Sequence, residues 1–276
     1  MTDLSAVFAA SHNLPTVSGV VQELILSFAD ATIDSGKITE QLKRDQTLTA
    51  RVLRLANTPM YGGSRRISSI SDAVLMLGFD ALRTLVLSCG LTSAVKTPKG
   101  FDIKAFWGQS FKVAAVSAWL ARTCRQNADI AFTVGLMHNL GDVLLFIVYP
   151  EKASAILQQV QTGRNRVDVE NSLLGFSYAE VGAELARRWN FPEDMVRAIA
   201  DQEQPLAAHP VSPQALLIYL AKILVQAMNA QVPAERLGEI LPHAVLDALR
   251  INLDIVITRY SELSEAGSEV ASLVLS

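Results

Sequence analysis

Apolar residues along this chain recur at spacings of three and four positions almost throughout. Such spacing places apolar side chains on one face of an α-helix, whereas strict alternation of apolar and polar residues is typical of a half-buried strand. No run combines sustained alternation with an enrichment in β-branched residues. The sequence therefore predicts an all-α protein.

Turn-forming and capping residues divide this pattern into separate helices. A break is expected near 45–49, and Pro59 closes the same helical stretch because the residue before a proline disfavours helical geometry. Ser71 and Asp72 are the N-cap candidates of the next helix, and Gly78 marks a turn between two helices. Further helices are expected at about 103–126, 128–139, 142–149, 151–162, 168–174, 177–189 and 192–201, and from 214 onward.

The segment KTPKGFD at 96–102 is the clearest interruption of the helical pattern. Lysines, a proline and a glycine so close together are typical of a surface connection. We therefore predict an N-terminal helical unit at 1–97, packed on a larger helical bundle at 98–276. The tail after Ile251 is amphipathic and then polar, and its role stays open between fraying and docking on a partner.

The composition supports a substantial core, because 50% of the 276 positions are hydrophobic. Only 18% are charged, which raises the question of membrane spans. The most apolar stretches, 81–95 and 214–230, carry Arg83 and Lys222 and fall short of the roughly 18 apolar residues that a span needs. The N-terminus lacks the basic start and apolar block of a signal peptide. We expect a cytoplasmic protein with no membrane span.

The two cysteines agree with a cytoplasmic location, and the net charge limits the partners that the protein can bind. Cys89 and Cys124 both lie in apolar helical patterns, which predicts buried, reduced thiols. A net charge of -3 gives no overall attraction to nucleic acid or anionic lipid, so any such binding would have to be local.

Residues 37–66 depart from this overall charge, with seven basic side chains against two acidic ones. The stretch ITEQLKRDQTLTARVLRLAN within them has the pattern of a helix-turn-helix. Its second helix is poor in the Asn, Gln and Ser positions that read bases, so DNA binding ranks below binding of an acidic protein surface or a cyclic dinucleotide. Because tyrosine and arginine together in a loop are typical of an interaction hot spot, the predicted interaction surface consists of Arg51, Arg54, Tyr61, Arg65 and Arg66.

Residues 135–142, GLMHNLGD, place His138 in an apolar run just before a glycine, as a helix end often presents a metal ligand. The next residue, Asn139, is a neutral amide where an aspartate would be the expected second ligand. Asp142 could pair with His138 four positions earlier, which would give a minimal metal site. A carboxylate in the first turn of the next helix also stabilises that helix start, and this interpretation is preferred.

Several longer phrases stand in a fixed order along the chain: LPTVSGVVQEL at 14–24, KRDQTLTARVLRLANTPMYGGSRRISSISDAVLMLGFDALRTLVL at 43–87, AFWGQSFKVAAVSAWLA at 105–121, AFTVGLMHNLGDVLL at 131–145, and LLGFSYAEVGAELARRWNFPEDMVRAIADQEQP at 173–205. Together they resemble the HDOD domains, catalytically degenerate relatives of the HD phosphohydrolases found in bacterial signalling proteins. The resemblance covers about 14–226 and implies a multi-helix HDOD fold.

By this resemblance, an active HD enzyme holds one or two divalent cations with a histidine on one helix, a His-Asp dyad on a second and an aspartate on a third. The matching positions here are Gln109, the pair His138 and Asn139, and Lys222, so only one histidine is kept. Neutral amides are weaker ligands than carboxylates, and an ammonium group repels a cation. Metal binding is therefore not expected.

Two further positions depart from the family pattern in the same direction. Histidines are common in the family where Tyr178 stands and where the pair Gln202 and Glu203 stands. We predict that Gln109, His138 and Asn139 form a polar cluster, which is either pure scaffold or the floor of a ligand-sensing pocket. The predicted vestigial pocket consists of Gln109, His138, Asn139, Asp142 and Lys222.

The resulting expectation is a non-enzymatic regulatory module of bacterial signal transduction, with no catalytic residue, metal or cofactor. It would act through a protein partner, with a cyclic dinucleotide or another anion as a further candidate ligand. The alternatives are a metal-dependent HD phosphohydrolase with an atypical ligand set, and a DNA-binding regulator that uses 37–66.

Overall fold

The computed structural model describes residues 4–9, 15–28, 35–57 and 66–274, with side chains described up to 263. All regular secondary structure in these residues is helical, as predicted. The N-terminal helices are α1 Leu4–Ala9, α2 Gly19–Leu26, α3 Ser35–Arg44, α4 Gln46–Ala56, α5 Ile70–Leu77 and α6 Phe79–Ala94. The remaining helices are α7 Ile103–Thr123, α8 Ala128–Met137, α9 Leu140–Val148, α10 Pro150–Gln161, α11 Arg166–Leu173, α12 Tyr178–Arg188, α13 Glu193–Ala200, α14 Pro213–Asn229, the short 3₁₀ helix η1 Ala234–Arg236, α15 Leu237–Ile240, α16 His243–Leu249 and α17 Leu253–Val274.

The predicted helix boundaries agree with these bounds to within about three residues from α7 to α13. The expected break near 45–49 is the single residue Asp45, which ends α3 and caps α4 by accepting a hydrogen bond from the Leu48 amide at 2.9 Å. Gly78 separates α5 from α6 with a φ of 85°, a left-handed conformation that glycine adopts without strain.

The predicted N-cap of α5 is wrong. Ser69, not Ser71 or Asp72, is the cap: its hydroxyl accepts a hydrogen bond from the Asp72 amide at 3.0 Å. Ser71 and Asp72 lie inside the first turn. Ser69, Ser71 and Asp72 are all capping-type residues within four positions, and the choice among them depends on the path of the preceding chain, which local preference does not encode.

This assignment makes a testable prediction about the start of α5. Ser69→Ala should lower the free energy of unfolding by about 1 kcal/mol, because the amide it caps loses its partner. Ser71→Ala should change it by less than about 0.5 kcal/mol. Urea denaturation of the two variants measures both values, and equal losses would contradict the assignment.

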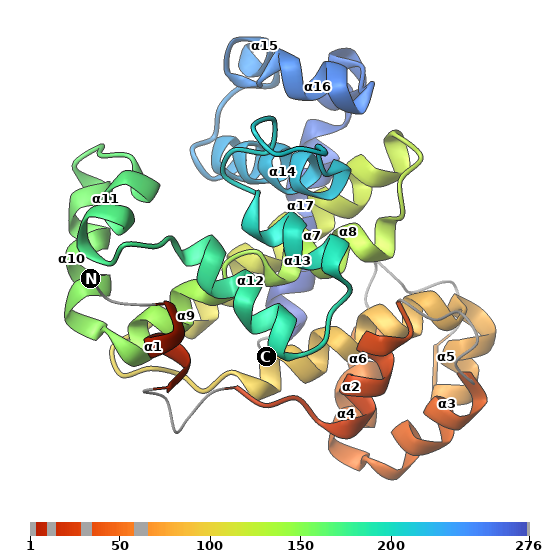
Figure 1. The fold of residues 1–276 in the computed structure, drawn as a ribbon. Helices are drawn as coiled ribbons and strands as arrows, with labels where there is room; N and C mark the ends of the chain where they lie inside the picture. Colours follow the sequence, from red (N-terminus) through yellow and green to blue (C-terminus); the bar gives the residue numbers. More distant parts are fainter. Residues whose placement is uncertain (1–3, 10–14, 29–34, 58–65, 275–276) are drawn as a thin grey trace.

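The long helix α7 forms the centre of the bundle and buries side chains on nearly all its faces. Helices α8, α14 and α17 pack against it. Helices α2 to α6 group at one end of the molecule, and α10 and α11 lie at the other (Figure 1). The N-terminal group is joined to the bundle by packing of α6 on α8 and of α4 on α17.

The tail after Ile251 forms α17, which docks on its own chain. Val256, Tyr260 and Leu263 are buried where this helix runs along α7 and reaches α4. The amphipathic pattern of the tail is therefore explained by packing within the molecule.

The two apolar stretches considered as membrane spans lie in the buried helices α6 and α14. Among the described residues, Ala128–Val148 is long and apolar enough to cross a membrane by length and composition alone. Within the fold, 78% of its most apolar window is buried. This stretch comprises α8 and α9, and its apolar character is that of a core segment.

Both cysteines are free thiols. Cys89 is buried in α6, and burial raises its pKa to about 12, so it is not a reactive thiolate. Cys124 is only half-buried at the end of α7, which is less than predicted.

Candidate functional site

His138 lies at the junction of α8 and α9, with its side chain almost completely buried. The ring Nδ1 donates a hydrogen bond to the Gly135 carbonyl at 2.6 Å. Burial, and after it the nearby Lys222 ammonium, lowers the pKa of His138 to about 3. The imidazole is therefore neutral in neutral solution.

The predicted cluster of Gln109, His138 and Asn139 is wrong in its first member. Asn139 is buried, but its side-chain oxygen accepts a hydrogen bond from the Ser110 hydroxyl at 2.9 Å. The Gln109 side chain is half-buried and instead accepts from the exposed Asn229 at 3.0 Å, between α7 and α14. Since α7 is buried on nearly every side, apolar periodicity does not distinguish the face of Gln109 from that of Ser110.

Gln202 connects the histidine junction to a second group of polar side chains. It is fully buried, and its amide nitrogen donates to the carbonyl of His138 at 2.7 Å. Its amide oxygen accepts from the Tyr178 hydroxyl at 3.2 Å and from Lys222 Nζ at 3.4 Å. Gln202, in the loop after α13, thus connects the α8–α9 junction to α12 and α14.

An ion pair between Lys222 on α14 and Glu203, in the loop after α13, completes this group. The Tyr178 hydroxyl hydrogen-bonds Glu203 and accepts from Lys222 at 2.9 Å. Burial lowers the pKa of Lys222, an effect that Glu203 opposes. Burial alone would raise the pKa of Glu203, but Lys222 and Tyr178 together hold it below its usual value. The pair therefore persists in its charged form.

A second ion-pair group lies on the other side of Tyr178. Arg166 pairs with Glu170 at 2.8 Å and with Asp142, and its guanidinium carbon lies 4.0 Å from the centre of the Tyr178 ring. Glu170 is fully buried and also accepts from the Tyr178 amide at 2.9 Å. Asp142 stands in the first turn of α9, as the sequence predicts, and its charge is directed to Arg166.

These contacts define one polar network, buried at Glu170, Tyr178 and Gln202 and partly buried at its other members, which spans α9, α11, α12, α14 and the loop after α13. It consists of Asp142, Arg166, Glu170, Tyr178, Gln202, Glu203 and Lys222. Its charges are two cations and three carboxylates, so it is nearly compensated within itself. A compensated network of this kind fixes the positions of helices and leaves few free lone pairs.

The network depends on a close approach of two backbones. A Cβ atom added to Gly141 would lie 1.9 Å from the carbonyl oxygen of Tyr178. Only glycine allows α9 to cross α12 at this distance, and the crossing sets the position of Tyr178 relative to His138.

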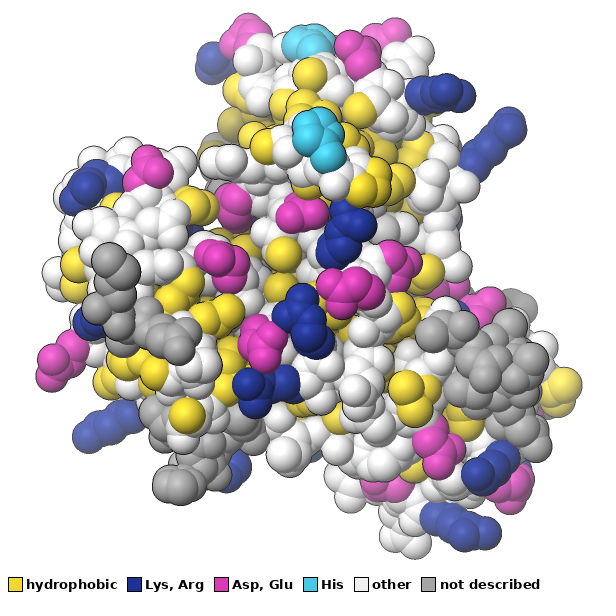
Figure 2. All heavy atoms as spheres, in the orientation of Figure 1, with side chains coloured by type: hydrophobic (Ala, Val, Ile, Leu, Met, Phe, Trp, Pro, Cys, Tyr) yellow, Lys and Arg dark blue, Asp and Glu magenta, His cyan; other side chains and the backbone are white. Residues whose placement is uncertain are grey.

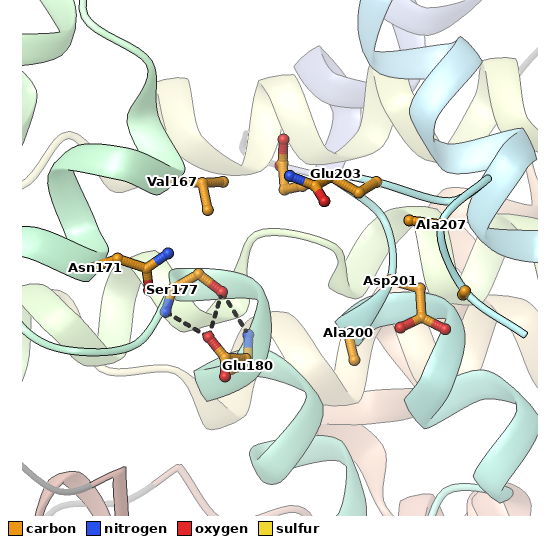
Figure 3. A pocket seen from close by; sticks show the side chains of 10 residues that line it. Val167, Asn171, Ser177, Glu180, Ala200, Asp201, Glu203 and Ala207 are labelled. Atoms are coloured by element: carbon orange, nitrogen blue, oxygen red, sulfur yellow. Dashed lines mark hydrogen bonds between the residues drawn. The ribbon is translucent and has the colours of Figure 1, made fainter.

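A hollow of about 390 Å³ opens beside Glu203. Figure 3 shows the carboxylates of Glu180, Asp201 and Glu203 around it, with Glu180 held in a capping box by Ser177. No Lys, Arg or His is among the lining residues. A phosphate-bearing ligand would be repelled here, so this hollow does not fit the anionic ligand considered from the sequence.

The residues at this site do not fit the divalent cation of an HD enzyme. In the described part of the chain, no group of three or more His, Cys, Asp or Glu side chains is arranged to hold a metal ion. Lys222, whose charge lowers the pKa of His138, stands where the resemblance would expect a carboxylate. Of the other histidines, His209 and His243 are exposed, and His12 lies outside the described residues.

The predicted interaction surface is only partly visible. Arg51, Arg54 and Arg66 are exposed, and Arg51 hydrogen-bonds the Ser93 hydroxyl. Tyr61 and Arg65 lie outside the described residues. The role of this surface stays a prediction.

Sequence reasoning missed part of the network. The only signal for Tyr178, Gln202 and Glu203 was their departure from the family pattern. Such departures are expected together where a set of metal ligands has been replaced by other residues. Arg166 and Glu170 carried one weak signal, a pair of opposite charges four residues apart on a helix. Ser110 carried none.

An all-helical bundle with a histidine at a helix junction, facing polar side chains from several helices, belongs to the HD-type class of folds. The chain is a member of the HDOD domain family, whose sequence model matches residues 14–205. This family is related to HD phosphohydrolases and to signal transduction proteins.

Known structures agree with this assignment. A Shewanella amazonensis SB2B protein, named as a candidate phosphohydrolase, is 31% identical with a TM-score of 0.84, over 98% of this chain and 97% of that one. A Geobacter sulfurreducens HDOD domain protein of unknown function shares the fold, at 24% identity and a TM-score of 0.82, over 97% of each chain. So does a Marinobacter aquaeolei VT8 protein named for signal transduction, at 24% identity and a TM-score of 0.76, over 95% of this chain and 60% of that one.

An uncharacterized protein of Treponema pallidum (strain Nichols) is 26% identical over 244 residues. The match covers 87% of this chain and 46% of the relative, so the chain spans about half the length of the curated relative it matches.

Proposed function

We propose that this chain is a non-catalytic regulatory module of a signalling pathway, acting through protein–protein binding. The observation that carries the proposal is the Lys222–Glu203 ion pair behind His138. The Lys222 ammonium group lies in the pocket, and the Glu203 carboxylate neutralises its charge. A hydrolytic metal would have to displace this pair and would find neutral amides as ligands.

The proposal predicts the metal content and activity of the purified protein. The protein is incubated with Mn²⁺, Fe²⁺, Ni²⁺ or Zn²⁺ and desalted. Elemental analysis should then not find one metal ion per chain that is present in the wild type and lost in His138→Ala. Phosphate monoesters and diesters should not be hydrolysed above background. The matched control is His243→Ala, because His243 is exposed and only hydrogen-bonds the Gly238 carbonyl.

The alternative function is an HD phosphohydrolase with an atypical ligand set. About one metal per chain, kept by the wild type and by His243→Ala but lost together with turnover in His138→Ala, would establish that alternative and end the proposal.

DNA binding through 37–66 is less well supported by the geometry. A helix-turn-helix joins its helices by a turn of about three or four residues, whereas α3 and α4 are separated by Asp45 alone. Over α12 and α13, acidic and basic side chains are interspersed (Figure 2). On α12, Glu184 pairs with Arg187 and Arg188. This face carries no large patch of one sign. An acidic protein surface remains the preferred partner of Arg51, Arg54 and Arg66.

A further inference from the structure

The first observation is the apolar surface of α5. This helix, ISDAVLML, buries only Ile70 and Ala73, while Leu75 is 83% exposed and Met76 41% exposed. Leu75 is the most exposed large hydrophobic side chain in the described part of the chain. Apolar side chains gathered at the end of a helix in this way are typical of a docking surface.

The second observation is a hollow of about 390 Å³ beside this end of α5, between the N-terminal helices and the bundle. Met76 and Leu77 form one wall, and the buried ring of Phe132 on α8 lies in another. Its volume is at the lower end of the range of about 300 to 1,000 Å³ typical of ligand pockets. It therefore suits a few side chains better than a large cofactor, and Met76 and Leu77 supply the apolar part of its wall.

The third observation is the charge at the rim. Arg122 lines the hollow, and Arg125 follows three residues later; both are exposed, and no described carboxylate pairs with either. The one lining carboxylate, Asp129, accepts from the Thr84 hydroxyl at 3.2 Å and lies in Coulombic range of the buried Arg83. The charge left uncompensated at the rim is positive.

We infer that this hollow docks an amphipathic helix of a partner protein, with apolar side chains entering beside Met76 and an Asp or Glu reaching Arg122. The helix-in-groove mode combines an apolar anchor with a charged residue at the edge. The charge of the rim selects an acidic helix over a basic one. The inference rests on the proposed binding role and adds where the partner docks and what its chemistry is.

A displayed library of helical peptides built from Leu, Ile, Phe, Ala, Asp, Glu and Lys tests this inference on the full chain. Selection should enrich peptides that carry an acidic residue beside an apolar stripe. Fluorescence anisotropy of the enriched peptides, resynthesised, should show binding weakened about tenfold by Arg122→Glu and about fivefold by Met76→Gln.

The controls are matched to these variants. Leu157→Gln changes a side chain on α10 that is 40% exposed, close to the exposure of Met76, and Arg164→Glu reverses an exposed charge between α10 and α11, away from both proposed surfaces. Both should leave the dissociation constant within about twofold. All four positions are exposed, so the unfolding midpoints should stay close to that of the wild type.

Several results would overturn the inference. The selection could enrich no peptide, or it could enrich peptides that carry Lys in place of an acidic residue. The enriched peptides could also bind Arg122→Glu and Met76→Gln as tightly as the wild type. Self-association of the wild type that Met76→Gln abolishes would assign the hollow to a second copy of this chain instead. Any of these would leave the non-catalytic proposal standing, whereas a metal-dependent turnover would end that proposal and leave peptide binding measurable.

Discussion

Gly141→Ala should lower the free energy of unfolding by about 3 kcal/mol or more, at the upper end of the usual cost of overpacking. The added methyl group would lie 1.9 Å from the Tyr178 carbonyl oxygen, and the atom in its way is backbone, which cannot rotate aside. Separating α9 from α12 would also pull Tyr178 away from Gln202 and Glu203. Chemical denaturation followed by circular dichroism measures the loss.

The matched control is the facing glycine of the same crossing. A Cβ on Gly182 would lie 3.4 Å from Gly141 N and from the Ile199 side chain, which is ordinary contact. Gly182→Ala should therefore cost less than about 1 kcal/mol, since alanine also gains helix propensity over glycine. Similar losses in the two variants would contradict the geometry of the crossing.

The stability of the protein should fall as the pH is lowered from 7.5 to 5, mainly because of His138. In the unfolded chain the pKa of this imidazole is near its ordinary value of 6.5, while in the folded protein burial and Lys222 lower the pKa to about 3. Between these values the unfolded state binds a proton that the folded state does not. Protonation therefore favours unfolding, by about 2 kcal/mol at pH 5.

The window above pH 5 separates this effect from that of Glu203. Lys222 holds the pKa of Glu203 below its usual value, so its contribution is present above about 4.5 and is lost only as the pH falls further. Free energies of unfolding measured from pH 7.5 to 5 should show the slope in the wild type and in His243→Gln. The slope should be absent in His138→Gln, and a slope that persists there would assign the titration to another group.

Most helix boundaries could be predicted because each carries a local signal. The end of α7 is followed by Asn127, which caps α8, and Ser177 caps α12 through a capping box with Glu180. Such signals depend only on neighbouring residues. The cap of α5 was predicted wrongly because Ser69, Ser71 and Asp72 offer similar local chemistry within four positions.

The site could be predicted only in outline. His138, Asn139 and Lys222 lie in one buried region, because Gln202 contacts both the His138 carbonyl and Lys222. Whether Gln109 or Ser110 of α7 points inward could not be predicted, because this helix is buried on nearly all its faces. The pairing of Arg166 with Asp142, 24 positions apart, depends on how α9 and α11 each pack on α10, and no local pattern encodes that.

The packing of α17 against α7 limits where the chain can be truncated without unfolding. The family match stops at residue 205, yet α14 and α17 cover the central helix from the region beyond it. A fragment cut at that boundary would leave the apolar sides of α7 open to water, so it would aggregate or remain unfolded. We therefore expect the smallest part of this protein that folds by itself to extend beyond residue 205.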